Sequence, residues 1–163
     1  AYFGEKEVQW GSDSKRTMGL IVSILLIQLI AVLGAWLTSK LVGKYGNIAV
    51  LMGLNFSWIL ICTYAYFVVT PNDFYIAAAF VGLVMGGIQS LSRSTYSKFI
   101  PEDTKDTTSF FSFYDVAEKI GIVIGMFTYG YIADVTGKIQ HAILFLILFF
   151  VVGLLLLLRV PKK

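Results

Sequence analysis

Charged residues are scarce in this sequence. Asp, Glu, Lys and Arg make up only 14% of its 163 residues, against roughly 25% in an ordinary soluble domain. Hydrophobic residues make up 57%, and the mean hydropathy is +0.77. A domain of this size keeps a large surface in contact with its solvent. Such an apolar surface excludes an ordinary water-soluble domain and indicates a lipid bilayer as the solvent.

Cysteine and histidine each occur once, as Cys62 and His141. One cysteine excludes an internal disulfide and a thiolate metal cluster, and one histidine without nearby cysteines makes no metal site. The motifs of serine hydrolases, zinc proteases and phosphate-binding loops are also missing. We therefore expect no enzyme, no metal and no cofactor. The basic residues form no dense patch beside aromatic residues, which excludes a nucleic-acid partner.

Four long uncharged runs dominate what remains, and a fifth run, residues 107–133, is interrupted only by Asp115, Glu118 and Lys119. Each is long enough for a transmembrane helix of about 20 residues. We predict five spans, at residues 17–39, 47–70, 74–97, 108–133 and 140–159. These runs are too long and too uniform for barrel strands. The predicted fold class is therefore all-α, a polytopic membrane helix bundle. Because the connections are short, residues 1–163 form a single membrane domain.

The basic residues are distributed unequally between the two ends of these spans. One side receives eight of them: Lys40, Lys44, Arg93, Lys98, Lys105, Arg159, Lys162 and Lys163. The other side receives four: Lys6, Lys15, Arg16 and Lys138. Basic residues concentrate on the cytoplasmic side of a membrane protein. This count predicts a cytoplasmic carboxy terminus.

Small residues recur at every fourth position of the third span: Ala78, Gly82, Gly86, Ser90 and Ser94. Such a stripe lets two helices approach closely in a membrane. Gly121 and Gly125 repeat the spacing in the fourth span. We interpret both stripes as helix-packing faces, with a flexing point at Gly86 and Gly87 as the alternative.

The third and fourth spans also carry the polar residues that are costly in lipid. Gln89 and Arg93 share a face of the third span, and Arg93 either snorkels to the headgroups or lies in the bundle. In the fourth span, Asp115 and Lys119 are one turn apart and can pair, while Glu118 shares their face. Ionisable groups at this depth face a cavity or the bundle interior. They are either a structural ion pair or a solute contact or proton-carrying carboxylate.

The remaining polar residues within the spans have simpler interpretations. Gln28 and Asn55 are typical of interhelical hydrogen bonds. Aromatic packing is the expected role of Phe113 and Tyr114, and His141 lies at a membrane boundary.

Three strings in the third and fourth spans resemble the major facilitator superfamily. They are residues 86–94 (GGIQSLSRS), 99–102 (FIPE) and 109–116 (SFFSFYDV). Within that superfamily, they are similar to the branch of autophagy-related vacuolar amino-acid effluxers and their bacterial relatives. A loop pattern recurrent in the superfamily, G-x-x-x-D-x-x-G-[KR], is matched by Gly130, Asp134, Gly137 and Lys138.

This resemblance implies that the five spans correspond to helices eight to twelve of a twelve-helix transporter. Residues 1–4 would then be the last piece of helix seven, and the chain would be part of a transporter half. The partner would be a missing amino-terminal half or a second copy of the chain. The location would be the plasma membrane in a bacterium or the vacuolar membrane in a fungus, with both termini of the full protein in the cytoplasm. The substrate-binding candidates are Gln28, Gln89, Arg93, Tyr114, Asp115 and Glu118.

One departure from the superfamily pattern lies between the first two spans. Residues 34–40 lack the Asp that the superfamily often places four residues after the glycine. A charge latch at this loop is therefore not expected.

Two functional hypotheses follow from these observations. The first is secondary active transport of a small polar solute, such as an amino acid, by alternating access, with the site near the bilayer midplane. In that case Asp115, Glu118 and Lys119 serve as an ion pair or in coupling. The second is a non-transporting membrane scaffold or interaction subunit, in which the charges only hold the bundle together. A channel ranks last because no selectivity string is present.

Overall fold

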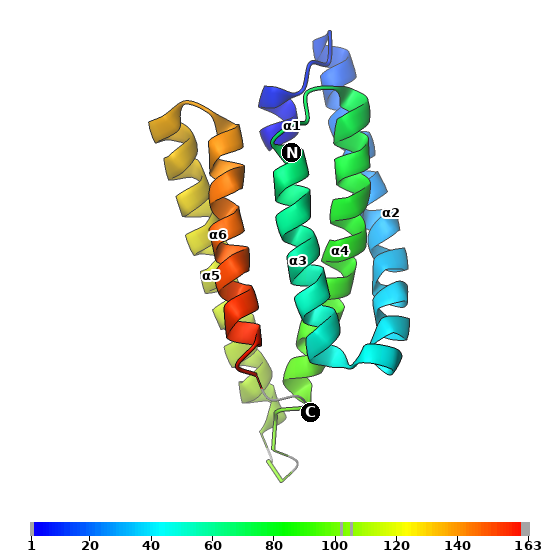
Figure 1. Ribbon diagram of the computed structural model, residues 1–163, viewed down its shortest axis with the longest axis vertical. Coiled ribbons are helices and arrows are strands. Elements are labelled where there is room, and N and C mark those ends of the chain that lie inside the picture. Colours follow the sequence, from blue (N-terminus) through cyan, green and yellow to red (C-terminus); the bar gives the residue numbers. More distant parts are fainter. Residues whose placement is uncertain (1, 102, 105, 161–163) are drawn as a thin grey trace.

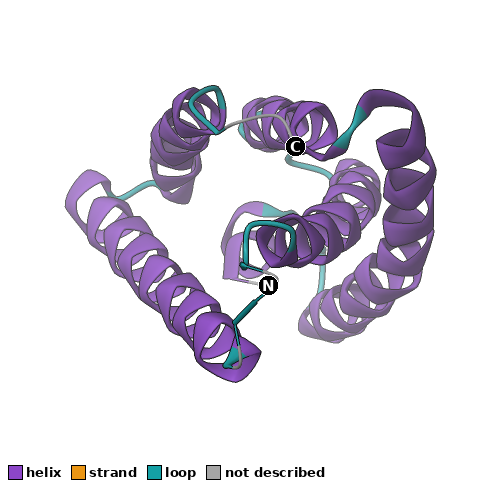
Figure 2. Cartoon of the chain, turned by 90° about the horizontal axis from the view of Figure 1, so that it is seen from below, coloured by secondary structure: helices purple, strands orange, loops and turns teal. Residues whose placement is uncertain are grey.

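The computed structural model of the protein describes residues 2–101, 103–104 and 106–160. Six helices follow one another in this part of the chain: α1 (Tyr2–Glu7), α2 (Asp13–Tyr45), α3 (Asn47–Ala65), α4 (Pro71–Ser97), α5 (Thr107–Thr136) and α6 (Ile139–Leu157). Figure 2 shows only helices and loops in the described residues. The all-α class is confirmed. Five residues that entered the predictions above lie outside the described residues: Ala1, Glu102, Lys105, Lys162 and Lys163.

Four of the five long helices, α2, α3, α4 and α6, are both long enough and apolar enough to cross a membrane. The fifth, α5, has 30 residues, which is a length of about 45 Å at 1.5 Å per residue. It does not reach the same apolar character, because Asp115, Glu118 and Lys119 interrupt it. Four candidate spans are therefore found, and the spanning role of α5 remains a prediction.

The helix boundaries follow from local capping residues. The Ser12 side chain accepts a hydrogen bond from the Lys15 backbone N–H at the start of α2, and Gly46, with φ of 82°, ends that helix. Capping side chains of this kind satisfy N–H groups that have no partner in the first turn. A positive φ is accessible to glycine at little cost.

The second predicted span, residues 47–70, is too long at its end. The helix α3 stops at Ala65, residues 66–67 form a turn, and residues 68–70 connect it to α4 without regular structure. The next helix, α4, begins where the Thr70 side chain accepts a hydrogen bond from the Asp73 backbone N–H. Pro71 then occupies the first turn of α4, where its missing N–H has no cost.

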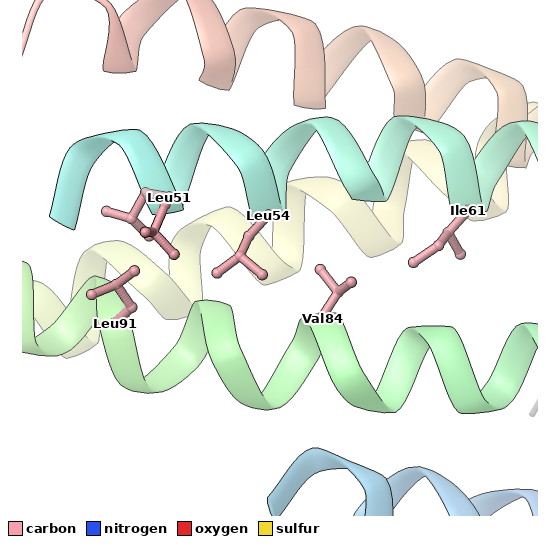
Figure 3. Packing of buried hydrophobic residues seen from close by; sticks show 6 residues of the cluster. Leu51, Leu54, Ile61, Val84 and Leu91 are labelled. Carbon is pink, nitrogen blue, oxygen red and sulfur yellow. The ribbon is translucent and has the colours of Figure 1, made fainter. Parts of the chain in front are cut away.

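The core lies between α3 and α4. Buried side chains from both helices form one cluster: Val50, Leu51, Leu54, Ile61, Val84 and Leu91. Figure 3 shows the α3 residues directed at the α4 residues. In Figure 1, α5 and α6 lie on one side of α3 and α4, and α2 lies on the other. The core therefore joins two outer parts of the bundle.

The small-residue stripe of α4 packs on α2, as predicted. A methyl group on Gly82 would lie 2.6 Å from the backbone oxygen of Ile27, and one on Gly86 would collide with the Ala31 carbonyl. A methyl group on Gly34 of α2 would likewise collide with the backbone carbonyl of Leu83 on α4. The two backbones are thus in direct contact. The helix α4 runs unbroken through Gly86 and Gly87.

The equivalent stripe of α5 is not packed. A methyl group on Gly121 or Gly125 would meet no atom of the described residues within 4 Å. The packing role predicted for these two glycines is therefore not found here. The short helix α1 and the linker after it lie against α4 and α6, where Trp10 packs edge-on against Phe74 and Gln140 donates to Glu7.

Candidate functional site

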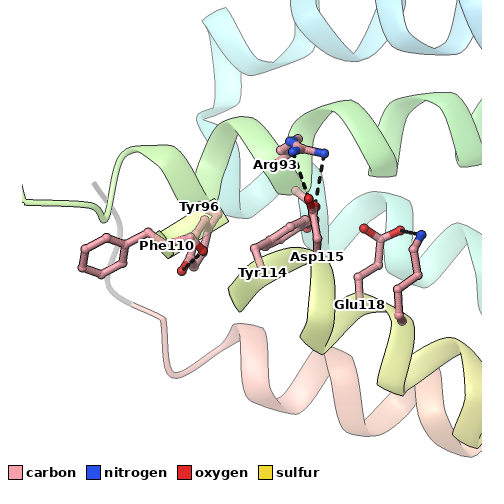
Figure 4. Close-up of polar contacts among 8 residues, drawn as sticks. Arg93, Tyr96, Phe110, Tyr114, Asp115 and Glu118 are labelled. Carbon is pink, nitrogen blue, oxygen red and sulfur yellow. Dashed lines mark hydrogen bonds and ion pairs between the residues drawn. The ribbon is translucent and has the colours of Figure 1, made fainter. Parts of the chain in front are cut away.

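The central contact of the candidate site is an ion pair between two helices. The Arg93 guanidinium on α4 faces the Asp115 carboxylate on α5, with Nη1 to Oδ1 at 3.3 Å and Nη2 to Oδ2 at 3.5 Å. Figure 4 shows these two side chains directed at each other. Tight arginine–carboxylate pairs lie at about 2.7–2.9 Å, so this pair is loose. The side chains are also half exposed, at 53% and 46%.

Aromatic side chains support the ion pair on its loop side. The Tyr96 hydroxyl donates to the backbone oxygen of Phe110 at 3.0 Å, and the Tyr96 ring packs on the Tyr114 ring at 5.0 Å between centroids. The Arg93 guanidinium carbon lies 5.5 Å from the centroid of Phe111, within reach of a cation–π attraction. These contacts hold the end of α4 against the start of α5.

Tyr114 has a polar contact as well as an aromatic one. Its hydroxyl donates to Ser92 Oγ on α4 at 2.9 Å. Aromatic packing is the role expected from its residue type, and solute binding is the role implied by the resemblance. The structure places it between the two helices, where its ring packs and its hydroxyl faces polar groups.

Glu118 and Lys119 lie one turn further along α5. Lys119 Nζ is 3.9 Å from Glu118 Oε1, which is at the limit of an ion pair. The spacing of Asp115 and Lys119 allows them to pair, but in the structure Asp115 pairs with Arg93 across the two helices. Sequence spacing identifies neighbours within one helix only, so it could not identify Arg93 on α4. The guanidinium of Arg93 can bind a carboxylate through two nitrogens, which the ammonium of Lys119 cannot do.

A pocket of about 450 Å³ lies between α4 and α5 beside the ion pair. It is lined by Ile88, Gln89, Ser92, Arg93, Tyr114 and Glu118. Four of the six predicted substrate-binding residues therefore line one pocket, and Asp115 contacts it through Arg93. The pocket carries a guanidinium, a carboxylate, an amide and two hydroxyl groups. This donor and acceptor set suits a small polar solute with charge.

Gln28 lies elsewhere. It is exposed on α2 and is not among the residues that line this pocket. The described residues offer it no hydrogen bond, so its predicted interhelical bond is not found. The interhelical bond predicted for Asn55 is confirmed, because its Nδ2 donates to the Phe150 backbone oxygen on α6.

Sequence reasoning missed several residues of the site. Ser92, Tyr96 and Phe111 hold the predicted residues in place, and Ser92 also lines the pocket. Their spacing was a usable signal, because Ser92 and Tyr96 are one turn apart and flank Arg93. A second missed network joins α3 to the end of α4: Asn47 donates to Thr95 Oγ1 at 3.0 Å and accepts from Lys98 Nζ at 2.9 Å. No sequence pattern pointed to that network.

The residues of the glycine–aspartate pattern lie away from the ion pair, with Gly130 and Asp134 inside the last turns of α5 and Gly137 and Lys138 between α5 and α6. Gly137, with φ of 65°, ends α5, and Lys138 precedes the first residue of α6. Gly130 and Asp134 line a separate groove of about 670 Å³ with Phe3 and residues of α5 and α6. Only Gly137 has an evident backbone role, since its left-handed conformation favours glycine.

The described residues contain no group of three His, Cys, Asp or Glu side chains that could hold a metal ion. The single cysteine, Cys62, is buried in α3, away from the charged residues of α4 and α5.

Comparison with known proteins gives the same picture. A family model described as "Vacuole effluxer Atg22 like" matches residues 1–163. The "Uncharacterized MFS-type transporter YxiO" of Bacillus subtilis is 32% identical over 156 residues, which is 94% of this chain and 36% of that relative. "Autophagy-related protein 22" of Eremothecium gossypii is 37% identical over 84 residues, covering 52% of this chain and 16% of the relative. No solved structure matches the chain.

These matches settle the class of the protein. The chain spans 36% of the length of its Bacillus relative, so it corresponds to part of such a transporter. The family match covers the whole chain and agrees with the candidate membrane spans. The chain is thus a multi-pass membrane protein that belongs to the Atg22-like effluxer family of MFS-type transporters, which are not enzymes.

Proposed function

We propose that the chain forms the carboxy-terminal part of a secondary transporter that moves a small polar solute by alternating access. The observation that carries this proposal is the pocket between α4 and α5, which places Arg93 and Glu118 around one space of about 450 Å³. Charged groups inside membrane segments are rare and mark solute or ion pathways. Amino acids are the first solute class to test, because they carry both charges that the pocket complements.

The arrangement in the membrane is part of the proposal. The helices α2 to α6 are five membrane spans, equivalent to helices eight to twelve of a twelve-helix transporter, and residues 1–163 are one membrane domain. The carboxy terminus is cytoplasmic, in the plasma membrane of a bacterium or the vacuolar membrane of a fungus. Support comes from the length of α5 and from the basic residues Lys40, Lys44, Lys98 and Arg159 at one side.

The solute pathway requires a partner. Alternating access rocks two repeat halves against each other around a site between them. The chain supplies one face of such a site, and an amino-terminal half or a second copy supplies the other. Asp115, Glu118 and Lys119 act in solute contact or in coupling to an ion.

Transport by the intact polypeptide in liposomes tests this function. Uptake of radiolabelled amino acids should fall about tenfold or more in Arg93→Ala, the equivalent of about 1.4 kcal/mol of lost binding. In Asp115→Asn, the uptake should differ from that of the native protein, because Arg93 loses its partner. Asp13→Asn is the matched control, because Asp13 forms an exposed ion pair with Arg16 away from the pocket. Identical transport by all three variants and the native protein would assign the charges a purely structural role.

If the intact polypeptide moves no amino acid or other small polar solute, the transport proposal is wrong. The chain would then act as a membrane scaffold, and its charged residues would only join α4 to α5.

A further inference from the structure

The contact between α4 and α5 is confined to one end of both helices. Its hydrogen bonds, ion pair and ring contacts come from residues 92–96 of α4 and residues 110–115 of α5. Further along, α5 lies beside α6, while α4 lies beside α2 and α3 (Figure 1). We call this contact the α4–α5 seam. It closes one end of the space between the two helices.

The seam differs in kind from the contact that holds α4 to α2. Gly82 and Gly86 bring the α2 and α4 backbones into direct contact, and such packing resists sliding because interiors are close-packed. The seam consists of side-chain tips, and its ion pair is half exposed. Exposed ion pairs contribute about 0.2–1 kcal/mol. If either contact separates during transport, the seam is the one that separates at lower cost.

The seam and the solute pocket share residues. Arg93 and Tyr114 line the pocket, and the same two side chains bind Asp115 and Ser92 in the seam. The guanidinium uses both terminal nitrogens on Asp115. An anionic group in the pocket therefore competes with Asp115 for the same donors, because a guanidinium fork matches a carboxylate in one plane.

We propose that the Arg93–Asp115 pair is an exchangeable latch, in which an anionic group of the solute replaces Asp115 on Arg93 and the α4–α5 seam opens. The inference rests on the proposed function, because it takes the pocket as the solute site. It adds that the solute must carry an anionic group, and that binding this group separates α5 from α4 within one half of the transporter.

Spin-label distances measure the seam directly. Labels are placed at Ser94→Cys on α4 and Phe113→Cys on α5, which are exposed residues outside the proposed latch, in a Cys62→Ala background. The matched control pair is Ser94→Cys with Leu41→Cys across the α2–α4 contact. The intact polypeptide is reconstituted in phosphatidylcholine nanodiscs and titrated with L-alanine, acetate and methylammonium.

L-alanine and acetate should lengthen the Ser94–Phe113 distance, whereas methylammonium should leave it unchanged. The control distance should not respond to any of the three. Asp115→Asn should raise the ratio of open to closed seam about two- to fivefold without solute, which is the range expected for an exposed ion pair. Arg16→Gln, which breaks the exposed Asp13–Arg16 pair, should leave the ratio unchanged.

An equal response to methylammonium, or a seam that Asp115→Asn leaves closed, would overturn the latch. Opening caused by adding phosphatidylglycerol to the nanodiscs, with no response to acetate or L-alanine, would also overturn it, since the anion would then be a lipid headgroup. The two proposals fail separately. Transport with a fixed seam rejects the latch alone, and a seam that responds without solute movement rejects the transport function alone.

Discussion

Asn55 on α3 donates a hydrogen bond of 2.9 Å from its amide nitrogen to the backbone oxygen of Phe150 on α6. Next to it, the rings of Trp58 and Phe150 stack with centroids 5.4 Å apart. The α3–α6 contact thus combines a part-buried hydrogen bond with an aromatic stack. Because α5 packs mainly on α6, this contact also connects α5 to the core of the bundle.

Asn55→Ala should destabilise the fold by about 1 kcal/mol, because interhelical hydrogen bonds in membrane proteins contribute about 0.6 kcal/mol on average and up to about 1.7. The free energy of unfolding in mixed detergent micelles measures the effect. Ser57→Ala is the control, since the Ser57 hydroxyl donates to Gly53 within its own helix. Equal losses in both variants would contradict the interhelical role of Asn55.

Gly86→Ala should be costly although it adds a single methyl group. The new atom would collide with the Ala31 carbonyl of α2, and forced overpacking costs about 1–3 kcal/mol. Gly121→Ala adds the same atom where no neighbour lies within 4 Å, and alanine is about 1 kcal/mol more favourable than glycine inside a helix. Thermal unfolding should therefore show a loss for the first variant and no loss for the second.

The cap of α5 should depend on pH. Hydrogen bonds from the Ser109 hydroxyl and backbone N–H hold the pKa of Asp106 below its ordinary value of 3.8. A carboxyl group whose pKa is lowered on folding stabilises the fold above its unfolded pKa, and this contribution is lost as pH falls through the folded pKa. Hydrogen exchange at the Ser109 amide should therefore become less protected as pH drops below about 4. Asp106→Asn, which keeps a capping oxygen but does not titrate, should remove this pH dependence.

Trp10→Phe should loosen α1. The Trp10 indole donates to the Gly4 backbone oxygen at 2.7 Å in a buried position, and leaving such an acceptor unpaired costs about 1–3 kcal/mol. Faster hydrogen exchange in α1 measures the change. Trp36→Phe is the control, because Trp36 is exposed on α2 and should leave exchange in α1 unchanged. A rigid α1 in Trp10→Phe would show that ring packing alone holds it.

Much of the helix layout could be predicted from the sequence. Uncharged runs located four of the long helices, and a run interrupted by three charged residues located α5, since few residues other than apolar ones are stable in lipid. The end of α3 was misplaced because residues 66–69 are as apolar as the helix before them. Thr70 marks the start of the next helix, because its side chain caps α4. The sequence alone does not show which backbone N–H this side chain will bind.

The site was predictable in content but not in pairing. The depth of Asp115 in its span indicated an inward-facing charge, and the structure places it against another helix. Its partner could not be chosen from spacing, because Lys119 is near in sequence and Arg93 is near only after α4 and α5 have packed. The network of Asn47, Thr95 and Lys98 was missed for the same reason, since its members come from different helices.

The direct contact between the α2 and α4 backbones has a genetic consequence. Arg93 lies two turns after Gly86 on one continuous helix, so the spacing at Ala31 sets where the guanidinium sits relative to α2. A genetic selection for altered solute preference should therefore recover substitutions on α2, at Ile27 or Ala31, that do not contact the solute. Such substitutions would change the affinity for the solute by changing the angle between α2 and α4.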